Sequence, residues 1–241
     1  MLSELRQPLG AWTLTKHVKG KRGGKTPRRT LGQVRTALTR RRILKAALTE
    51  FARKGFAGAS VREIARKAGL GDGLVHYHFG SKEMLWRAVA KDLFDDLHAK
   101  IETEDAQAQT LDELGKVRLR ARNLIGYHLE HPELQAFVGQ EFERRSPRLT
   151  YIIETFINVR LPAALAGILK SQKLGELPNG DPHLLYIIIT TLAQALSRHA
   201  GEIEELTGRS IRDETLQAEY WNLVDELIFA PRHRKLANSK S

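Results

Sequence analysis

Apolar residues recur every three or four positions along most of this chain, the spacing of one face of an α-helix. The longest stripe carries five such residues between Leu85 and Ile101. The run YIIIT at 186–190 is β-branched enough for a strand, but it lies inside a longer helical pattern, so we assign it to a helix. The pattern predicts an all-α fold, with helices at 38–55, 61–68, 72–79, 82–102, 110–130, 132–145, 148–173, 182–205 and 213–229.

Start and stop signals support several of these boundaries. Gly55 follows Lys54, a typical helix end. Ser60, with Glu63 three residues later, forms a capping box, and Ser81 is placed to cap the helix that begins after it. Pro162 lies inside a helical pattern and should kink or divide that segment, because proline lacks the N–H that a helix interior needs.

Residues 61–79 combine two short helices with a three-residue turn. So steep a crossing requires a small residue where the helices meet, and Ala65 is placed there. The turn needs a residue that tolerates positive φ, and Gly69 occupies it. The apolar residues available to fill the wedge between the helices are Ile64, Leu70 and Val75. Together these features indicate a DNA-binding helix-turn-helix, with the helix at 38–55 supporting it from behind.

The same stretch carries a family pattern, including the run YHFGSKEML. The residues of that pattern are Ile43, Ala47, Phe51, Gly55, Phe56, Ile64, Ala65, Ala68, Gly69, Gly73, Tyr77, His78, Phe79, Lys82, Glu83 and Leu85. In them, residues 41–85 resemble the TetR family of bacterial transcriptional regulators. The resemblance implies an N-terminal three-helix helix-turn-helix domain, followed by a larger helical domain for ligand binding and dimerisation.

Carried over by position, the resemblance makes 72–79 the recognition helix in the major groove and places Lys82 on a phosphate. A helix N-terminus suits phosphate, because its N–H groups are free and its dipole end is positive. Three arginines at the predicted start of the first helix oppose that dipole, which favours a role facing phosphates. The predicted DNA contacts are Arg40, Arg41, Arg42, Ser60, Arg62, Gly71, Asp72, Gly73, Leu74, His76, Tyr77, His78 and Lys82.

Four positions depart from the family or give its reading face an individual character. Gly71 stands where Ser or Thr is common, so the helix cap is weaker. Asp72 suits a helix N-terminus, or accepts a hydrogen bond from a cytosine amino group. Leu74 is placed to touch a thymine methyl. His76 replaces a common tyrosine, and because a protonated histidine is the stronger donor to phosphate, we hypothesise pH-dependent binding. These four positions should carry the operator preference.

Charge divides the chain unevenly. Residues 1–100 hold 22 Lys and Arg against 8 Asp and Glu, whereas the remainder holds 17 against 20. A basic half suits a polyanion such as DNA. The stretch KGKRGGKTPRR at 19–29 has too few large apolar residues to fold alone and could lie in a minor groove. The predicted organisation is a flexible basic arm at 1–37, the DNA-binding domain at 38–100, the ligand-binding and dimerisation domain at 101–230, and a solvated tail at 231–241.

Other functions have little support. GLGDG is spaced GxGxG rather than GxGxxG, no strand precedes it, and no phosphate-loop motif occurs. His76 and His78, two apart on a helix, point in opposite directions and cannot share a metal. The chain has no cysteine, no GxSxG and no HExxH, so we predict no enzyme, catalytic residue, cofactor or metal. It shows no secretory signal and no apolar run near 18 residues, which favours the cytoplasm and no membrane partner.

The second half is less specific. Aromatic residues suggest a pocket, and a helix-turn-helix usually needs two-fold symmetry, so we expect a homodimer built by the last two long helices. The candidate pocket residues are Tyr127, Phe137, Phe142, Tyr151, Phe156 and Tyr186. The candidate dimer residues are Leu185, Ile189, Leu192, Leu196, Leu216, Tyr220, Leu223 and Leu227.

These inferences predict a sequence-specific transcriptional regulator. Its partners would be double-stranded operator DNA, a second copy of the chain and an unidentified small-molecule effector. The expected mechanism is release from a palindromic operator when the effector binds. The alternatives are an activator of the same family, and a sequence-indifferent DNA-packing protein, against which the large near-neutral second half argues.

Overall fold

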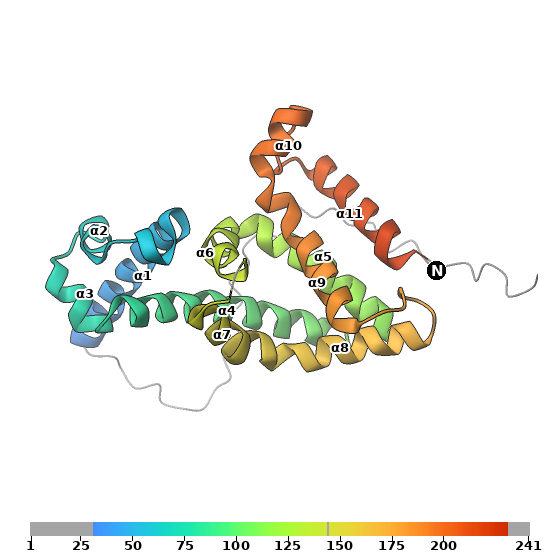
Figure 1. Ribbon diagram of the computed structural model, residues 1–241, viewed down its shortest axis with the longest axis horizontal. Coiled ribbons are helices and arrows are strands. Elements are labelled where there is room, and N and C mark those ends of the chain that lie inside the picture. The colour runs from blue at the N-terminus through green and yellow to red at the C-terminus, as the bar shows by residue number, and fades with distance from the viewer. Residues whose placement is uncertain (1–30, 144, 231–241) are drawn as a thin grey trace, which may run out of the picture. The chain divides into compact units, whose positions relative to one another are not determined.

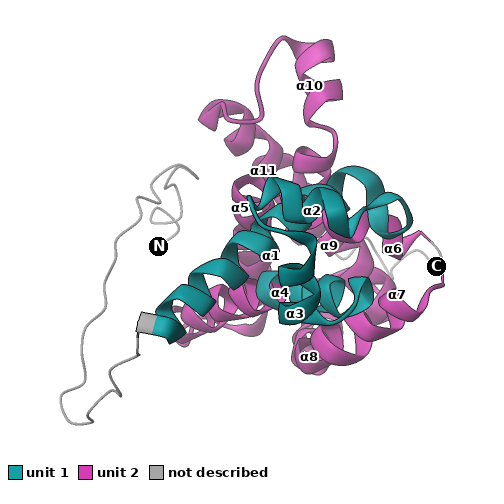
Figure 2. Ribbon diagram, turned by 90° about the vertical axis from the view of Figure 1, so that its left-hand side faces the viewer, with its two compact units in different colours: residues 1–93 teal, residues 94–241 magenta. Residues whose placement is uncertain are grey.

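A computed structural model describes residues 31–143 and 145–230 of the chain. Within these residues every regular element is helical, which confirms the predicted all-α fold (Figure 1). The chain divides into two compact units, which are coloured separately in Figure 2. Unit 1 comprises residues 1–93 and unit 2 comprises residues 94–241, so the division falls inside one long helix, seven residues before the predicted domain boundary.

Unit 1 contains α1 (Leu31–Gly58), α2 (Val61–Lys67), α3 (Asp72–Phe79) and the first part of α4 (Lys82–Gln107). The α2–α3 pair packs on α1 through the predicted small and apolar residues. Ala65 is fully buried, and Gly69 adopts φ 64°, a conformation that side chains rarely take. The largest residues of this core are Ile43, Phe51, Ile64, Val75, Leu85, Trp86 and Val89.

The predicted caps are present. Ser60 Oγ accepts the N–H of Glu63 at 3.5 Å, and Ser81 Oγ accepts the N–H of Met84 at 3.1 Å. Only half of the capping box forms, because the Glu63 carboxylate turns to Arg66 at 2.9 Å instead of returning to the cap. Gly71 caps α3 without a side-chain hydrogen bond, as its residue type implied.

The first helix differs from the prediction at its start. α1 begins at Leu31, seven residues early, so 31–37 is helical rather than part of an arm. Residues 32–38 are exposed, and Val34 and Leu38 are spaced as on one helical face, a signal that the prediction did not use. The regular helix does stop at Gly55, where α1 is kinked. The basic stretch 19–29 and the tail from 231 lie outside the described residues.

Unit 2 is built around α5 (Glu113–Glu130), which packs against α8 (Asn158–Lys173) and α9 (Pro182–Arg198). α6 (Pro132–Phe142) covers α9, and α11 (Glu214–Phe229) lies against both α5 and α9 (Figure 1). An ion pair between Arg118 and Asp225 fixes α11 to α5. The remaining elements are the rest of α4, α7 (Pro147–Ile152), the π-helical turn η1 (Ile153–Ile157) and α10 (Ala200–Thr207).

Two predicted helices of unit 2 are interrupted. The segment 182–205 divides at His199 into α9 and α10. The segment 148–173 does not break at Pro162, which stays inside α8; the irregularity is η1, one turn earlier. A wider turn before a proline relieves the crowding of its ring against the preceding carbonyl. The YIIIT run is helical, as predicted.

The stretch Pro147–Lys173 is, by length and composition alone, apolar enough to cross a membrane. It is 27 residues long and is interrupted by Glu154 and Arg160. Arg160 donates to Glu102 on α4 at 2.6 Å, and Ile168 is buried, so the stretch is tied into the core of unit 2. Within the apolar window, 22% of the residues are buried.

Candidate nucleic-acid interface and cavity

The exposed side of α3 carries features that packing does not explain. Tyr77 is 81% exposed, and Leu74 is exposed beside it. Val75 and Phe79, on the opposite side of α3, are buried in unit 1. A methyl group added at Gly73 would meet nothing within 4 Å, so this glycine is not required by its neighbours although it weakens the helix. An exposed aromatic ring beside bare backbone indicates a surface made for close contact.

Charged and polar groups flank this surface. The Arg62 guanidinium lies 3.9 Å from the Asp72 carboxylate, which joins the start of α2 to the start of α3 across the turn. Lys82 donates to the carbonyl of Ala57 at 3.1 Å and lies over the Phe56 ring, at the N-terminus of α4. His78 is half-buried and meets the Tyr77 ring edge-on.

His76 makes a contact that the sequence did not suggest. Its Nδ1 lies 3.1 Å from the carbonyl of Gly80, just past the end of α3. Because a carbonyl only accepts, Nδ1 must carry the proton, which leaves Nε2 pointing away from this bond. His76 Nδ1 therefore caps the C-terminus of α3, and Nε2 is left for a contact with another molecule.

The predicted position of Arg40, Arg41 and Arg42 at a helix start was wrong. Because α1 begins at Leu31, Arg40, Arg41 and Arg42 lie in mid-helix and do not oppose its dipole. Arg42 donates to the carbonyl of Ala68 at 2.6 Å, which closes the C-terminus of α2. Arg40 lies over the Phe79 ring at 4.3 Å and donates to the carbonyl of His78. Cations suit helix C-termini, so Arg40 and Arg42 hold α2 and α3 in place, and Arg41 is exposed.

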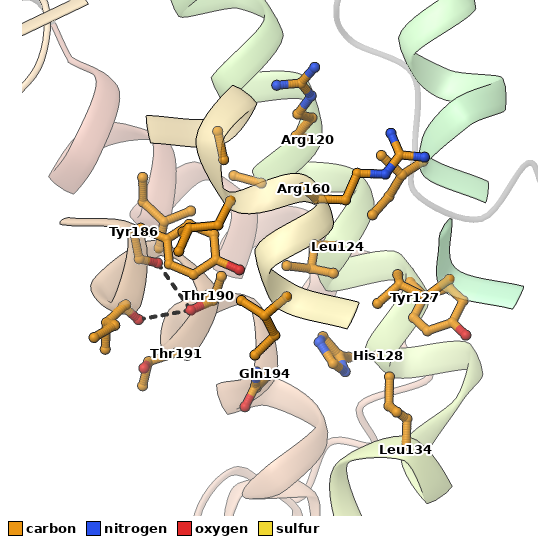
Figure 3. Close-up of a pocket in the computed structure, with 18 of the residues that line it drawn as sticks. Arg120, Leu124, Tyr127, His128, Leu134, Arg160, Tyr186, Thr190, Thr191 and Gln194 are labelled. Atoms are coloured by element: carbon orange, nitrogen blue, oxygen red, sulfur yellow. Dashed lines mark hydrogen bonds between the residues drawn. The ribbon is translucent and has the colours of Figure 1, made fainter. Parts of the chain in front are cut away.

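Unit 2 encloses a cavity of about 870 Å³ between α4, α5, α6, α8 and α9. The four predicted pocket residues among those that line it are Tyr127, Phe142, Phe156 and Tyr186. Phe137 and Tyr151 do not line it; Phe137 is buried in the core, and the Tyr151 ring packs edge-on against Phe156. In Figure 3, Thr190 and Gln194 of α9 and His128 of α5 are labelled among the lining residues.

Tyr127 belongs to the wall rather than to the open space. Its hydroxyl donates to Asp96 at 3.1 Å, and its ring stacks on His131. Burial, followed by the charge of Asp96, raises the pKa of Tyr127, so the phenol stays protonated. Tyr127 therefore ties α5 to α4 at the edge of the cavity.

Three buried polar atoms in the cavity wall have no hydrogen-bond partner within the described residues: Glu104 Oε1, His128 Nδ1 and Gln135 Oε1. Burial lowers the pKa of His128 to about 4, so this imidazole is neutral at neutral pH. The prediction missed all three residues. A signal was present, because Glu104 continues the apolar stripe of Leu97 and Ile101 at helical spacing.

Comparison with known proteins agrees with this geometry. Residues 43–89 match the family model of the bacterial regulatory proteins of the tetR family. Residues 43–89 therefore carry the DNA-binding domain of this family. The helix-turn-helix of unit 1 is of the type found in bacterial regulatory proteins, as the resemblance predicted.

Solved structures share the fold of this chain along most of its length. The transcriptional regulator SCO4942 from Streptomyces coelicolor is 24% identical, with a TM-score of 0.59 over 79% of this chain and 98% of that one. The ketosteroid transcriptional regulator KstR2 of Mycobacterium tuberculosis is 22% identical, with a TM-score of 0.62 over 79% and 94%. HlyIIR, a hemolysin II transcriptional regulator, is 22% identical, with a TM-score of 0.58 over 78% and 97%. No curated protein matches the chain in sequence.

The predicted dimer residues of this chain fall into three groups, which are half-buried, exposed and buried. Leu192 and Tyr220 are half-buried, with the Tyr220 hydroxyl bonded to the Leu192 carbonyl, whereas Leu223 and Leu227 on α11 are exposed. Residues buried within the chain itself cannot face a second copy, which corrects the prediction for four of the eight. These four are Leu185, Ile189, Leu196 and Leu216.

Proposed function

We propose that this TetR-family regulator is a ligand-responsive repressor, which binds a palindromic operator as a homodimer and leaves it when a small molecule fills the cavity of unit 2. The observation that carries the proposal is a cavity of about 870 Å³ whose wall holds three buried, unpaired polar atoms. Buried polar groups are nearly always hydrogen-bonded. A wall that leaves three of them unmet is suited to an occupant.

On the DNA side, α3 is the proposed recognition helix. Leu74 and Tyr77 supply its exposed apolar and aromatic contacts, and the bare backbone at Gly71 and Gly73 allows close approach to the groove. Arg62 and Asp72 flank its start as a pair, so the arginine is oriented before it meets DNA. Base edges are read by such a helix, while phosphates fix its register.

Phosphates are gripped at the N-terminus of α4. Lys82 stands there, at the positive end of the helix dipole, a position that suits an anion. Arg40 and Arg42 act indirectly in this proposal, because their hydrogen bonds hold the ends of α3 and α2. Arg41 and His76 Nε2 remain candidates for direct phosphate contacts.

The proposed dimer surface combines α9 and α11, which pack side by side. Both helices leave large apolar side chains uncovered, a pattern typical of protein–protein contacts. These exposed residues are Leu184, Ile188, Leu223 and Leu227. One helix-turn-helix reads few base pairs, so a two-fold pair of units supplies the affinity that one lacks.

The test is selection of bound fragments from a random DNA pool, followed by footprinting of the enriched sequence. We expect a discrete protected palindrome; uniform protection would mean a packing protein instead. An effector must then weaken operator binding by the same factor by which the operator weakens effector binding. A ligand that fills the cavity without changing operator affinity would contradict the proposed control, and transcription that rises with occupancy of the operator would mark an activator.

A further inference from the structure

The cavity wall holds a buried carboxylate that forms no ion pair with any described residue. Glu104, on α4, is only 7% exposed, and its Oε1 has no donor within the described residues. The carboxylate accepts one hydrogen bond, from Asn123 on α5. An isolated buried carboxylate is unfavourable, because it gives up hydration without receiving a compensating charge.

The charged residues nearby do not compensate it, since each has a partner of its own. Arg160 donates to Glu102 at 2.6 Å and Arg120 donates to Asp105 at 2.8 Å. Lys100, whose charge reaches Glu104, donates to Glu130 at 3.1 Å. These three ion pairs are neutral as a set, so the charge of Glu104 is left over at the cavity wall.

The two other unpaired atoms point to the same kind of occupant. Gln135 Oε1 only accepts hydrogen bonds, and His128 Nδ1 accepts them in one of its two neutral tautomers. The rest of the lining is mainly aliphatic and aromatic, from Phe94 and Leu97 on α4 to Ile168 on α8. The wall is therefore matched by an apolar body that brings hydrogen-bond donors.

We propose that the effector is an amphipathic organic cation, with an apolar body in the cavity and a protonated amine bonded to Glu104. The inference rests on the proposed effector role of this cavity and adds the chemical class of its ligand. A cation is favoured because charges attract strongly in a medium of low dielectric constant. A neutral molecule would leave the carboxylate unpaired, and an anion would be repelled by it, so the same residue selects against both.

The test uses three probes with one fluorescent apolar body: 1-pyrenebutylamine, its uncharged N-acetyl derivative and the anionic 1-pyrenebutyric acid. Fluorescence anisotropy measures their binding to the full chain without DNA. We expect the amine to bind about tenfold or more tightly than the N-acetyl form, and the acid more weakly still. In Glu104→Gln the preference for the amine should disappear. This variant keeps the side-chain shape and an oxygen for Asn123, and its folding is checked by circular dichroism.

The matched control is Glu205→Gln, which removes the same charge from an exposed position on α10 outside the cavity lining. It should keep the wild-type preference. The proposal is overturned if amine and N-acetyl probes bind equally, if Glu104→Gln keeps the preference, or if no probe binds. A separate measurement with operator DNA reads the proposed function: an amine that binds through Glu104 but leaves DNA affinity unchanged supports the ligand class and contradicts its effector role.

Discussion

The two units treat a buried glutamate in opposite ways. In unit 1, the fully buried carboxylate of Glu50 lies 2.7 Å from Lys54 Nζ and 2.6 Å from Lys67 Nζ. Hydrogen bonds from these two lysines lower the pKa of Glu50 to about 2. In unit 2, burial raises the pKa of Glu104, and among the described residues only Asn123 donates to it. The Glu50 carboxylate is paired with two lysines in the core of unit 1, whereas the Glu104 carboxylate lies without an ion-pair partner among the described residues, in the wall of the cavity of unit 2.

The two units also differ in where their groups without a binding partner lie. Unit 1 pairs its buried carboxylate with two lysines, and it presents Tyr77 and bare glycine backbone on the surface of α3. Unit 2 keeps unpaired atoms of Glu104, His128 and Gln135 inside, around a cavity. Groups without partners show where a partner is expected. We therefore expect unit 1 to act through its surface and unit 2 through its interior.

The largest effect on the core of unit 1 is expected from Glu50→Gln. The amide cannot hold both lysines as a carboxylate does, so unit 1 should lose on the order of 3 kcal/mol of stability. Native-state hydrogen exchange resolves the two units, and protection should fall in α1 and α2. The control is Glu63→Gln, which removes an exposed carboxylate from the same unit and should leave protection nearly unchanged.

The sign of the pH dependence follows from the lowered pKa of Glu50. The stabilisation is fully present above the unfolded value of 4.5 and is lost as pH falls toward about 2. Wild-type unit 1 should therefore lose protection in acid more steeply than Glu50→Gln. Equal acid sensitivity of the two proteins would mean that the lysine–carboxylate cluster does not hold unit 1 together.

Unit 2 should lose stability at milder acidity than unit 1, because of the buried His128. Its pKa falls from 6.5 to about 4 because the imidazole is buried, so the neutral form stabilises unit 2 above pH 6.5. Below that value the unfolded chain takes up a proton that the folded unit refuses, and unit 2 should lose about 2 kcal/mol by about pH 5. His128→Gln should remove this slope from hydrogen exchange in α5, whereas the exposed His183→Gln should keep it.

Much of unit 1 was predictable because its elements are fixed locally. Ser60, Gly69 and Ser81 are caps or turn residues whose chemistry acts within a few positions, and each does what its type predicts. The start of α1 was not predictable in this way. Residues 32–38 are exposed, so the apolar spacing of Val34 and Leu38 is not reinforced by burial. The helix-start position predicted for Arg40 and Arg42 was wrong for the same reason, because α1 begins at Leu31.

Unit 2 was less predictable, because its site depends on which residues of one stripe face a cavity and which fill the core. Leu185 and Leu196 have the same spacing and type as residues that could face a partner, yet both are buried. Aromatic residues divided in the same way, with Phe156 in the cavity wall and Phe137 outside it. Only tertiary packing separates these cases, whereas a charge within a stripe, as at Glu104, is visible in the sequence.

The proposed DNA contact of the α3 surface in unit 1 is tested by Tyr77→Phe. If the hydroxyl donates to a DNA phosphate, its loss should weaken operator binding about tenfold, because bonds to charged groups are the stronger ones. Stability should not change, since the ring is exposed. The dependence of affinity on salt should also stay the same, because no cation is removed. Lys82→Met provides the contrast and should reduce the salt slope by about one.

The smallest effect concerns Gly73, and its two readouts should move in opposite directions. Alanine fits the space, because an added methyl meets nothing within 4 Å, and it should stabilise α3 by about 0.5 to 1 kcal/mol. The same methyl would hold DNA away from bare backbone, so operator affinity should fall. Gly126→Ala is the matched control, since Gly126 lies inside α5 with equally open space. It should stabilise unit 2 and leave operator affinity unchanged. If Gly73→Ala left operator affinity unchanged, as its control should, the exposed backbone of α3 would not lie against DNA. Another surface of unit 1 would then have to bind the operator.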